Sequence, residues 1–135
     1  MEQAHPGYYQ VYLHTHRVNV ELSASEHVGA HKYQWDYPDR DLRVVIFHAS
    51  YTLNPGACDE ASVTVSGQSV TGFVHANGGL SGRFGGVKTY FVANITNTVV
   101  GFGTFDDNGV HPLGVTANGC KAGAYVVFSS EKGPV

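Results

Sequence analysis

Aromatic rings alternate with charged groups along residues 32–41 (KYQWDYPDRD), a segment that holds the only tryptophan of the chain. If this segment is extended, its rings share one face, because side chains alternate across a strand. Flat rings pack on the apolar faces of pyranoses, while carboxylates and guanidinium groups bond to sugar hydroxyls. The pattern therefore predicts a carbohydrate-binding site made of Trp35, Asp36, Tyr37, Asp39 and Arg40. The alternative is that these rings only anchor a long loop to the core.

A second candidate is the glycine-rich stretch Val74–Gly86, which presents His75, Asn77 and Arg83. These side chains suit a ligand rich in hydroxyls or an anion, and we expect them to extend the sugar site. The stretch lacks the Lys-Ser/Thr pair of a phosphate-binding loop, and no helix is expected after it. A plain glycine-rich connection between strands is the alternative.

Histidine is the third unusual feature, because the chain contains eight of them. Read as part of one strand, His14 and His16 lie on the same side, and His48 or His75 could join them from neighbouring strands. Three imidazoles around an open position bind zinc or another divalent transition metal, and a free imidazole also serves in acid and base catalysis. An enzyme built on His14 and His16, with His48 or His75, is the alternative to the sugar-binding domain, which needs no cofactor. Surface histidines bonded to water or backbone fit the HxH spacing equally well.

Composition limits the class of protein. The chain has 135 residues, 42% of them hydrophobic and 14% charged, which is enough to form one core without help. Eight Lys and Arg residues and a formal net charge of −3 leave no basic stripe for phosphates, so nucleic acid is not an expected partner. No apolar stretch approaches the roughly 20 residues of a membrane span.

The expected elements are strands, because β-branched and aromatic runs end at Gly, Asn and Pro. We expect seven to nine of them, with 23–41 as a loop or irregular hairpin and the strand from Leu42 in the centre of a sheet. The main runs are Tyr8–Leu22, Leu42–Leu53, the hairpin Ser62–Ser66 with Ser69–Ala76, the pair Lys88–Thr96 with Thr98–Phe105, and Ala122–Ser129.

Amphipathic helices of crossover length are missing from this pattern, which favours an antiparallel architecture. We therefore predict a single all-β domain over residues 1–135, an antiparallel β-sandwich with jelly-roll or Greek-key connections, with a closed β-barrel as the alternative. The leading functional hypothesis is a non-catalytic, lectin-like domain that binds a carbohydrate or another small molecule. Besides the histidine enzyme, a structural or assembly module that forms a homo-oligomer is the third hypothesis, and whether the protein is an enzyme stays open.

Two cysteines, Cys58 and Cys120, stand in turn-like surroundings 62 positions apart. They pair only if the fold brings the two turns together, and free thiols fit the spacing equally well. The first residues lack the layout of a signal peptide, which predicts a cytoplasmic protein. A secreted protein whose leader has been removed would have the same appearance, so secretion is kept as the alternative.

Overall fold

The structure is a computed structural model that describes residues 2–36, 42–51, 57–79 and 81–129. Every described element is a β-strand except one short 3-10 helix, η1 (Ser81–Phe84). The chain divides into two compact units, the first reaching from the N-terminus to Arg43 and the second spanning Val44–Ser129. The two units are described separately below.

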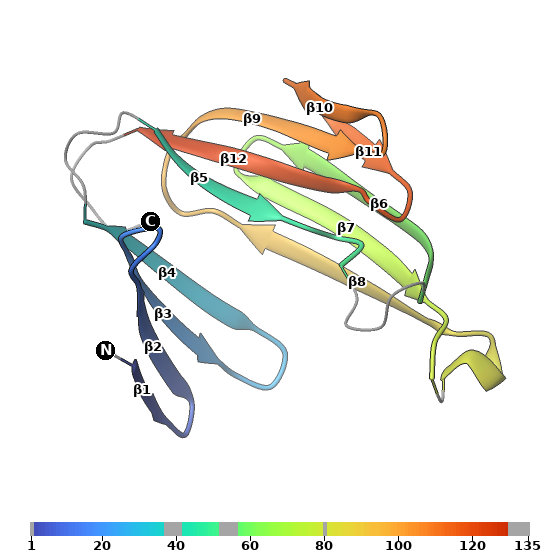
Figure 1. Ribbon diagram of the computed structural model, residues 1–135, viewed down its shortest axis with the longest axis horizontal. Helices are drawn as coiled ribbons and strands as arrows, with labels where there is room; N and C mark the ends of the chain where they lie inside the picture. Colours follow the sequence, from blue (N-terminus) through green and yellow to red (C-terminus); the bar gives the residue numbers. More distant parts are fainter. Residues whose placement is uncertain (1, 37–41, 52–56, 80, 130–135) are drawn as a thin grey trace. The chain divides into compact units, whose positions relative to one another are not determined.

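The first unit is an antiparallel meander of four strands in the order β1-β2-β3-β4 (Figure 1). Its strands are β1 (Glu2–His5), β2 (Tyr8–Leu13), β3 (Val18–Ala24) and β4 (Gly29–Trp35). The prediction of one long strand over 8–22 was wrong, because residues 14–17 form a turn between β2 and β3. Backbone bonds from His16 N–H to the carbonyl of Leu13 and from Arg17 N–H to that of His14 close the turn. The segment 23–41, expected as a loop or irregular hairpin, contains β4, which forms a hairpin with β3, while residues 37–41 lie outside the described part.

The strand register of this meander gives it two different faces. One face carries Val18 and Val20, which are 5% and 7% exposed, and the aromatic residues Tyr33 and Trp35 opposite them on β4. The other face is polar: Gln10 Nε2 donates to Asn19 Oδ1 at 3.0 Å, and Lys32 Nζ contacts Glu21 at 2.8 Å, with Tyr8 donating to the same carboxylate. The alternation of apolar and polar positions along β3 accounts for this division.

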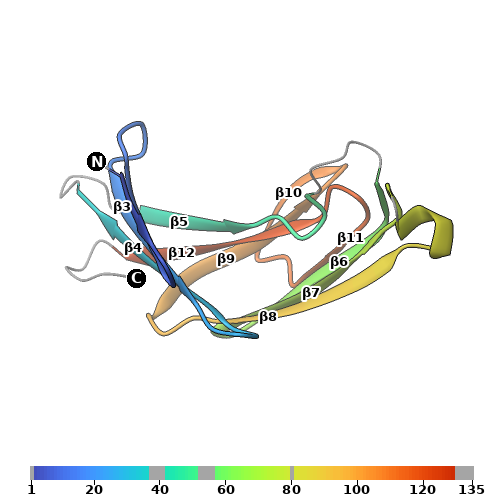
Figure 2. The same cartoon turned by 90° about the horizontal axis from the view of Figure 1, so that it is seen from below.

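The second unit is a pair of sheets with four strands each, in the orders β10-β9-β12-β5 and β11-β6-β7-β8. The first sheet contains β5 (Leu42–Phe47), β9 (Val99–Asp106), β10 (Gly109–Pro112) and β12 (Gly123–Ser129), and the second contains β6 (Cys58–Ser66), β7 (Ser69–Ala76), β8 (Val87–Asn94) and β11 (Thr116–Asn118). Figure 2 shows β6, β7 and β8 running side by side. The sheets are antiparallel and do not close into a barrel, so the predicted sandwich class is confirmed. The described residues contain more strands than the seven to nine expected.

Two local predictions for this unit have opposite outcomes. The hairpin of β6 and β7 around Gly67-Gln68 is confirmed, and Gly67 has a φ of 59°, which a residue without a Cβ adopts at no steric cost. The pairing of the next two strands was wrong, since β8 pairs with β7 in one sheet whereas β9 pairs with β10 and β12 in the other. Residues 95–98 therefore join the two sheets.

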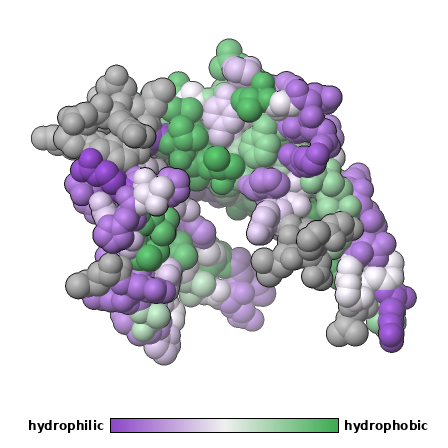
Figure 3. Space-filling view, in the orientation of Figure 1, coloured by the Kyte–Doolittle hydropathy of each residue, from purple (hydrophilic) through white to green (hydrophobic). Residues whose placement is uncertain are grey.

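The core of the second unit is made mainly of small aliphatic side chains. Val63, Val70 and Val126 are fully buried, and each such side chain stabilises the fold by roughly 1.5–3 kcal/mol. Strand β5 is at the end of its sheet, not in its centre as expected, and Val44 and Ile46 are 47% and 63% exposed. Figure 3 shows hydrophobic side chains gathered over β5 and β12. The apolar runs of β5 therefore mark an exposed apolar face, not a strand buried on both sides.

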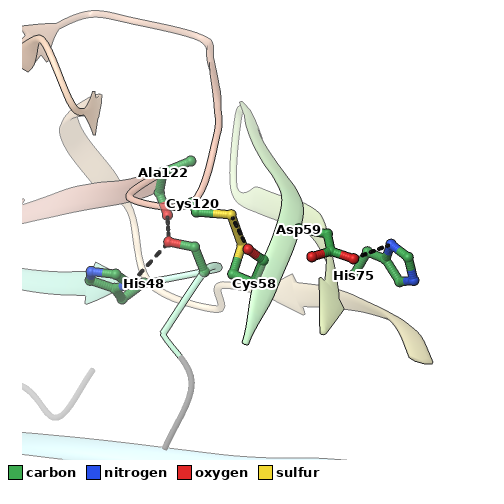
Figure 4. Close-up of a disulfide and its surroundings, with 7 residues drawn as sticks. His48, Cys58, Asp59, His75, Cys120 and Ala122 are labelled. Carbon is green, nitrogen blue, oxygen red and sulfur yellow. Dashed lines mark hydrogen bonds and ion pairs between the residues drawn. A yellow bond between two sulfur atoms is a disulfide. The ribbon is translucent and has the colours of Figure 1, made fainter. Parts of the chain in front are cut away.

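A disulfide joins Cys58, at the start of β6, to Cys120, in the turn before β12 (Figure 4). The two Cα atoms are 5.7 Å apart, within the usual range for such a bridge. Nearby, the buried Ser50 donates to the carbonyl oxygen of Ala122 at 3.1 Å. The bond resolves the open question about the cysteines, and it ties the two sheets of the second unit together at one end.

Candidate functional site

Trp35 is the last residue of β4, and its half-buried ring lies on the apolar face of the first unit. The ring of Tyr33, two residues earlier on the same face, lies 5.9 Å from it between centroids at an angle of 37°. The guanidinium carbon of Arg43 stands 5.8 Å from the centre of the indole, near the outer limit of a cation–π contact. Burial raises the pKa of the Tyr33 hydroxyl, so this phenol is neutral and can donate.

Asp36 follows Trp35 and is tethered to the turn between β2 and β3. Its backbone N–H donates to the carbonyl of Arg17 at 2.8 Å, and its Oδ2 accepts from the hydroxyl of Tyr12 at 3.2 Å. Nη2 of Arg17 lies 3.9 Å from the same oxygen, while the Asp36 side chain remains 71% exposed. The carboxylate is thus oriented by the protein and still open to a ligand. We call Tyr12, Arg17, Trp35 and Asp36 the Trp35–Asp36 cluster.

The cluster contains groups that suit a neutral polyol. An ionised carboxylate accepts bonds from two hydroxyls, a guanidinium donates, and an aromatic ring contacts C–H groups of a pyranose. Its ion pair is exposed, so it contributes little to folding stability. The strength of the arrangement lies in the direction of the Asp36 carboxylate, which Tyr12 and Arg17 hold.

The first sequence-predicted site is therefore described only in part. Trp35 and Asp36 are described, with the indole on the face of Val18 and the Asp36 carboxylate at Tyr12 on the other face. Tyr37, Asp39 and Arg40 lie outside the described residues, and the site stays a prediction. Sequence reasoning missed Tyr12 and Arg17, because reading 8–22 as one strand hid the turn that brings both to Asp36. The signal available was weak: four polar residues, HTHR at 14–17, interrupt two apolar runs.

The residues predicted from the glycine-rich stretch belong to the second unit, and His75 and Asn77 form bonds within it. Nε2 of His75 lies 2.8 Å from the carbonyl oxygen of Gly85, and its Nδ1 stands 3.8 Å from Asp59 (Figure 4). Backbone N–H of Asn77 donates to the carbonyl of Ala57. Arg83 is exposed on η1. His75 thus fastens the 77–86 connection to β7, and a ligand role for these three residues stays a prediction.

The histidine hypothesis rested on a strand that the structure replaces with a turn. His14 and His16 are both exposed in the 14–17 turn, and the His14 ring meets that of Tyr12 edge to face at 4.8 Å. His48 belongs to the second unit, where it contacts the rings of Tyr51 and Phe105. Among the residues that the structure describes, no group of three or more His, Cys, Asp and Glu side chains is placed to hold a metal ion.

Two carboxylates have a pKa below the ordinary value. The bond from Lys32, followed by that from Tyr8, lowers the pKa of Glu21. The bond with His111, together with the Asn108 backbone N–H, lowers the pKa of Asp106. Both groups are therefore ionised at neutral pH, as salt-bridged surface carboxylates usually are.

The described strands define an all-β domain of the sandwich class. Comparison with known protein families gives that class a family: the chain belongs to the glycosyl hydrolase family 92 N-terminal domain family, which it matches over residues 1–135. No curated protein matches the chain. Within its described part, no helix has the length and apolar character needed to cross a lipid bilayer.

Solved structures agree on the fold. A family GH92 α-mannosidase from Bacteroides thetaiotaomicron superposes with a TM-score of 0.80 at 21% identity, and its complex with mannoimidazole gives 0.79 at 21%. A family GH92 inverting mannosidase from the same species gives 0.76 at 19% identity. The chain is covered to 95% in each case but spans only 16–17% of the length of these proteins. At these identities the likeness concerns the fold alone.

Proposed function

We propose that this chain acts as the sugar-contacting N-terminal domain of a glycoside hydrolase that cleaves α-mannosides. The family match over all 135 residues supports the enzyme class, and the solved relatives named as α-mannosidases support the sugar. The observation that carries the proposal is the exposed Asp36 carboxylate, which Tyr12 orients and Arg17 accompanies, directly after Trp35 in the chain. This modifies the leading sequence hypothesis, since sugar binding is kept but serves an enzyme.

In this proposal the domain binds and orients sugar, while the proton transfers are made by other parts of the enzyme. A glycosidase general acid needs a carboxyl whose pKa is raised, so that it holds a proton near neutral pH. Glu21 and Asp106 are shifted in the opposite direction by their partners Lys32 and His111. These two carboxylates are suited to structural ion pairs.

Within the cluster each residue has a distinct part. The Asp36 carboxylate accepts bonds from two neighbouring sugar hydroxyls, and the Tyr12 hydroxyl fixes its orientation through the 3.2 Å bond. Trp35 offers an apolar ring surface next in the chain to Asp36, and Arg17, whose Nη2 lies 3.9 Å from the carboxylate, adds a donor. Preorganisation of this kind lowers the entropic cost of binding.

Isothermal titration calorimetry with α-linked mannobiose tests the proposal. We expect the Asp36→Asn variant to bind about ten-fold more weakly, because an amide replaces a charged acceptor and each 1.4 kcal/mol is ten-fold in affinity. Glu26→Gln is the matched control, since Glu26 is also an exposed carboxylate of the first unit, with an 88% exposed side chain. Equal loss in both variants, or none in either, would refute a site at Asp36.

A further inference from the structure

A second candidate site lies on the outer face of the sheet formed by β6, β7 and β8. Strand alternation turns Ala61, Val63 and Val65 of β6 into the core, so Ser62 and Thr64 between them face outward. The register places Ser62, Phe73 and Tyr90 in one row across the three strands. Thr64, Thr71 and Val92 form the next row. Figures 1 and 2 both show these strands side by side.

These two rows line a shallow groove of about 290 Å³. That volume is close to the lower end, roughly 300 Å³, of ordinary small-molecule sites. The backbone of Gly72 forms part of its lining.

The lining combines aromatic rings with hydroxyl groups. The rings of Phe73 and Tyr90 lie 5.7 Å apart at 43°, and Tyr90 is 69% exposed. Ser62, Thr64 and Thr71 supply hydroxyls beside these rings. Thr64 and Thr116 share a hydrogen bond of 3.2 Å at the far side of the sheet. Rings that offer apolar contact and hydroxyls that both donate and accept are the groups that a sugar requires.

The charge around the groove points to a neutral ligand. Lys88 stands beside the groove, with its Nζ 4.3 Å from the centre of the Phe73 ring. The same ammonium pairs with Glu60 at 3.1 Å, so the two charges offset each other. This end of the groove therefore has no net charge that would attract an anion or a cation.

We propose that this groove is a second sugar-binding site for a neutral manno-oligosaccharide, made of residues other than those of the Trp35–Asp36 cluster. The groove belongs entirely to the second unit, whereas the cluster belongs to the first. The choice of mannose rests on the proposed function, and the groove itself rests on the geometry of β6, β7 and β8. A protein surface that covers this face is the competing occupant.

The test is an NMR titration of the ¹⁵N-labelled chain with α-linked mannotriose. We expect shifts of the amides in the two rows, with saturation, in the wild type and equally in Trp35→Ala. Tyr90→Ala should weaken the affinity that these groove shifts report about ten-fold, because the aromatic contact surface is lost. Tyr51→Ala is the matched control, because Tyr51 is 70% exposed and lies in the same unit.

Each outcome separates the two proposals. Groove shifts that survive Trp35→Ala and fail in Tyr90→Ala support the second site. Shifts confined to the amides near Trp35 would overturn the groove and leave the proposed function standing. Groove shifts that weaken equally in Tyr90→Ala and Tyr51→Ala would also overturn it, because the effect would then not depend on the Tyr90 ring. A titration without any shift would overturn both.

Discussion

Gly103 on β9 lies against the ring of Tyr125 on β12, so close that a Cβ at position 103 would stand 2.6 Å from Cζ of the ring. The same Cβ would lie 2.6 Å from the carbonyl oxygen of His111. We expect Gly103→Ala to lower the free energy of unfolding by about 1–3 kcal/mol, as overpacking generally does. Urea denaturation measures this change.

Gly101 is the matched control for that substitution. A Cβ there would meet Val127 at 3.5 Å, an ordinary van der Waals contact. We expect Gly101→Ala to change the free energy of unfolding by less than about 1 kcal/mol. A loss as large as that of Gly103→Ala would mean that the close approach to Tyr125 is not the cause.

The Cys58–Cys120 disulfide closes a loop over 62 positions of sequence. In the chain-entropy description, a cross-link that closes a loop of this length raises the free energy of the unfolded chain by about 4 kcal/mol. We therefore expect the Cys58→Ala, Cys120→Ala double variant to lose about that much unfolding free energy in urea denaturation. Reduced wild type should behave like the variant, and unchanged stability in both would contradict a structural role for the bridge.

Arg17 has a φ of 48°, in the left-handed region that disfavours a side chain. We expect Arg17→Gly to be about 1 kcal/mol more stable than Arg17→Ala, because both lose the exposed contact with Asp36 and only glycine relieves the backbone. Thermal denaturation of the two variants compares them directly. Equal melting temperatures would show that the turn stores no strain.

The pH dependence of stability should contain a contribution from Asp106. Its bond with His111, aided by the Asn108 N–H, holds the pKa of Asp106 below the ordinary value. A carboxyl with a lower pKa in the folded chain stabilises it above the unfolded pKa, and this stabilisation is lost as the pH falls through the folded pKa. Below about pH 4, we expect the melting temperature of the wild type to fall more than that of Asp106→Asn. Parallel curves would contradict this.

The sequence predicted the fold class well, because period-two alternation and turn residues are local signals. The hairpin at Gly67-Gln68 and the last strand were found in this way. Sheet membership was not predictable, since β8 and β9 look like a hairpin in sequence and separate into different sheets in space. The 14–17 turn was missed because it contains neither Gly nor Pro and uses Arg17 in a left-handed conformation.

The candidate site was predicted through its residue types but not through its partners. Trp35 and Asp36 were chosen because aromatic and acidic groups adjoin in one segment. The Tyr12 contact with Asp36 spans 24 positions and depends on the register of β2, β3 and β4, which local pattern does not encode. Predicting the groove of the second unit from sequence would have required the same knowledge of strand register.

The most direct test of the central claim is the fluorescence of Trp35, the only tryptophan of the chain, during titration with α-linked mannobiose. Its emission reports one place in the protein without any label. We predict a saturable change in emission that is weakened in Asp36→Asn and retained in Glu26→Gln. An emission that stays constant while calorimetry detects bound mannobiose would contradict a sugar site at Trp35 and Asp36.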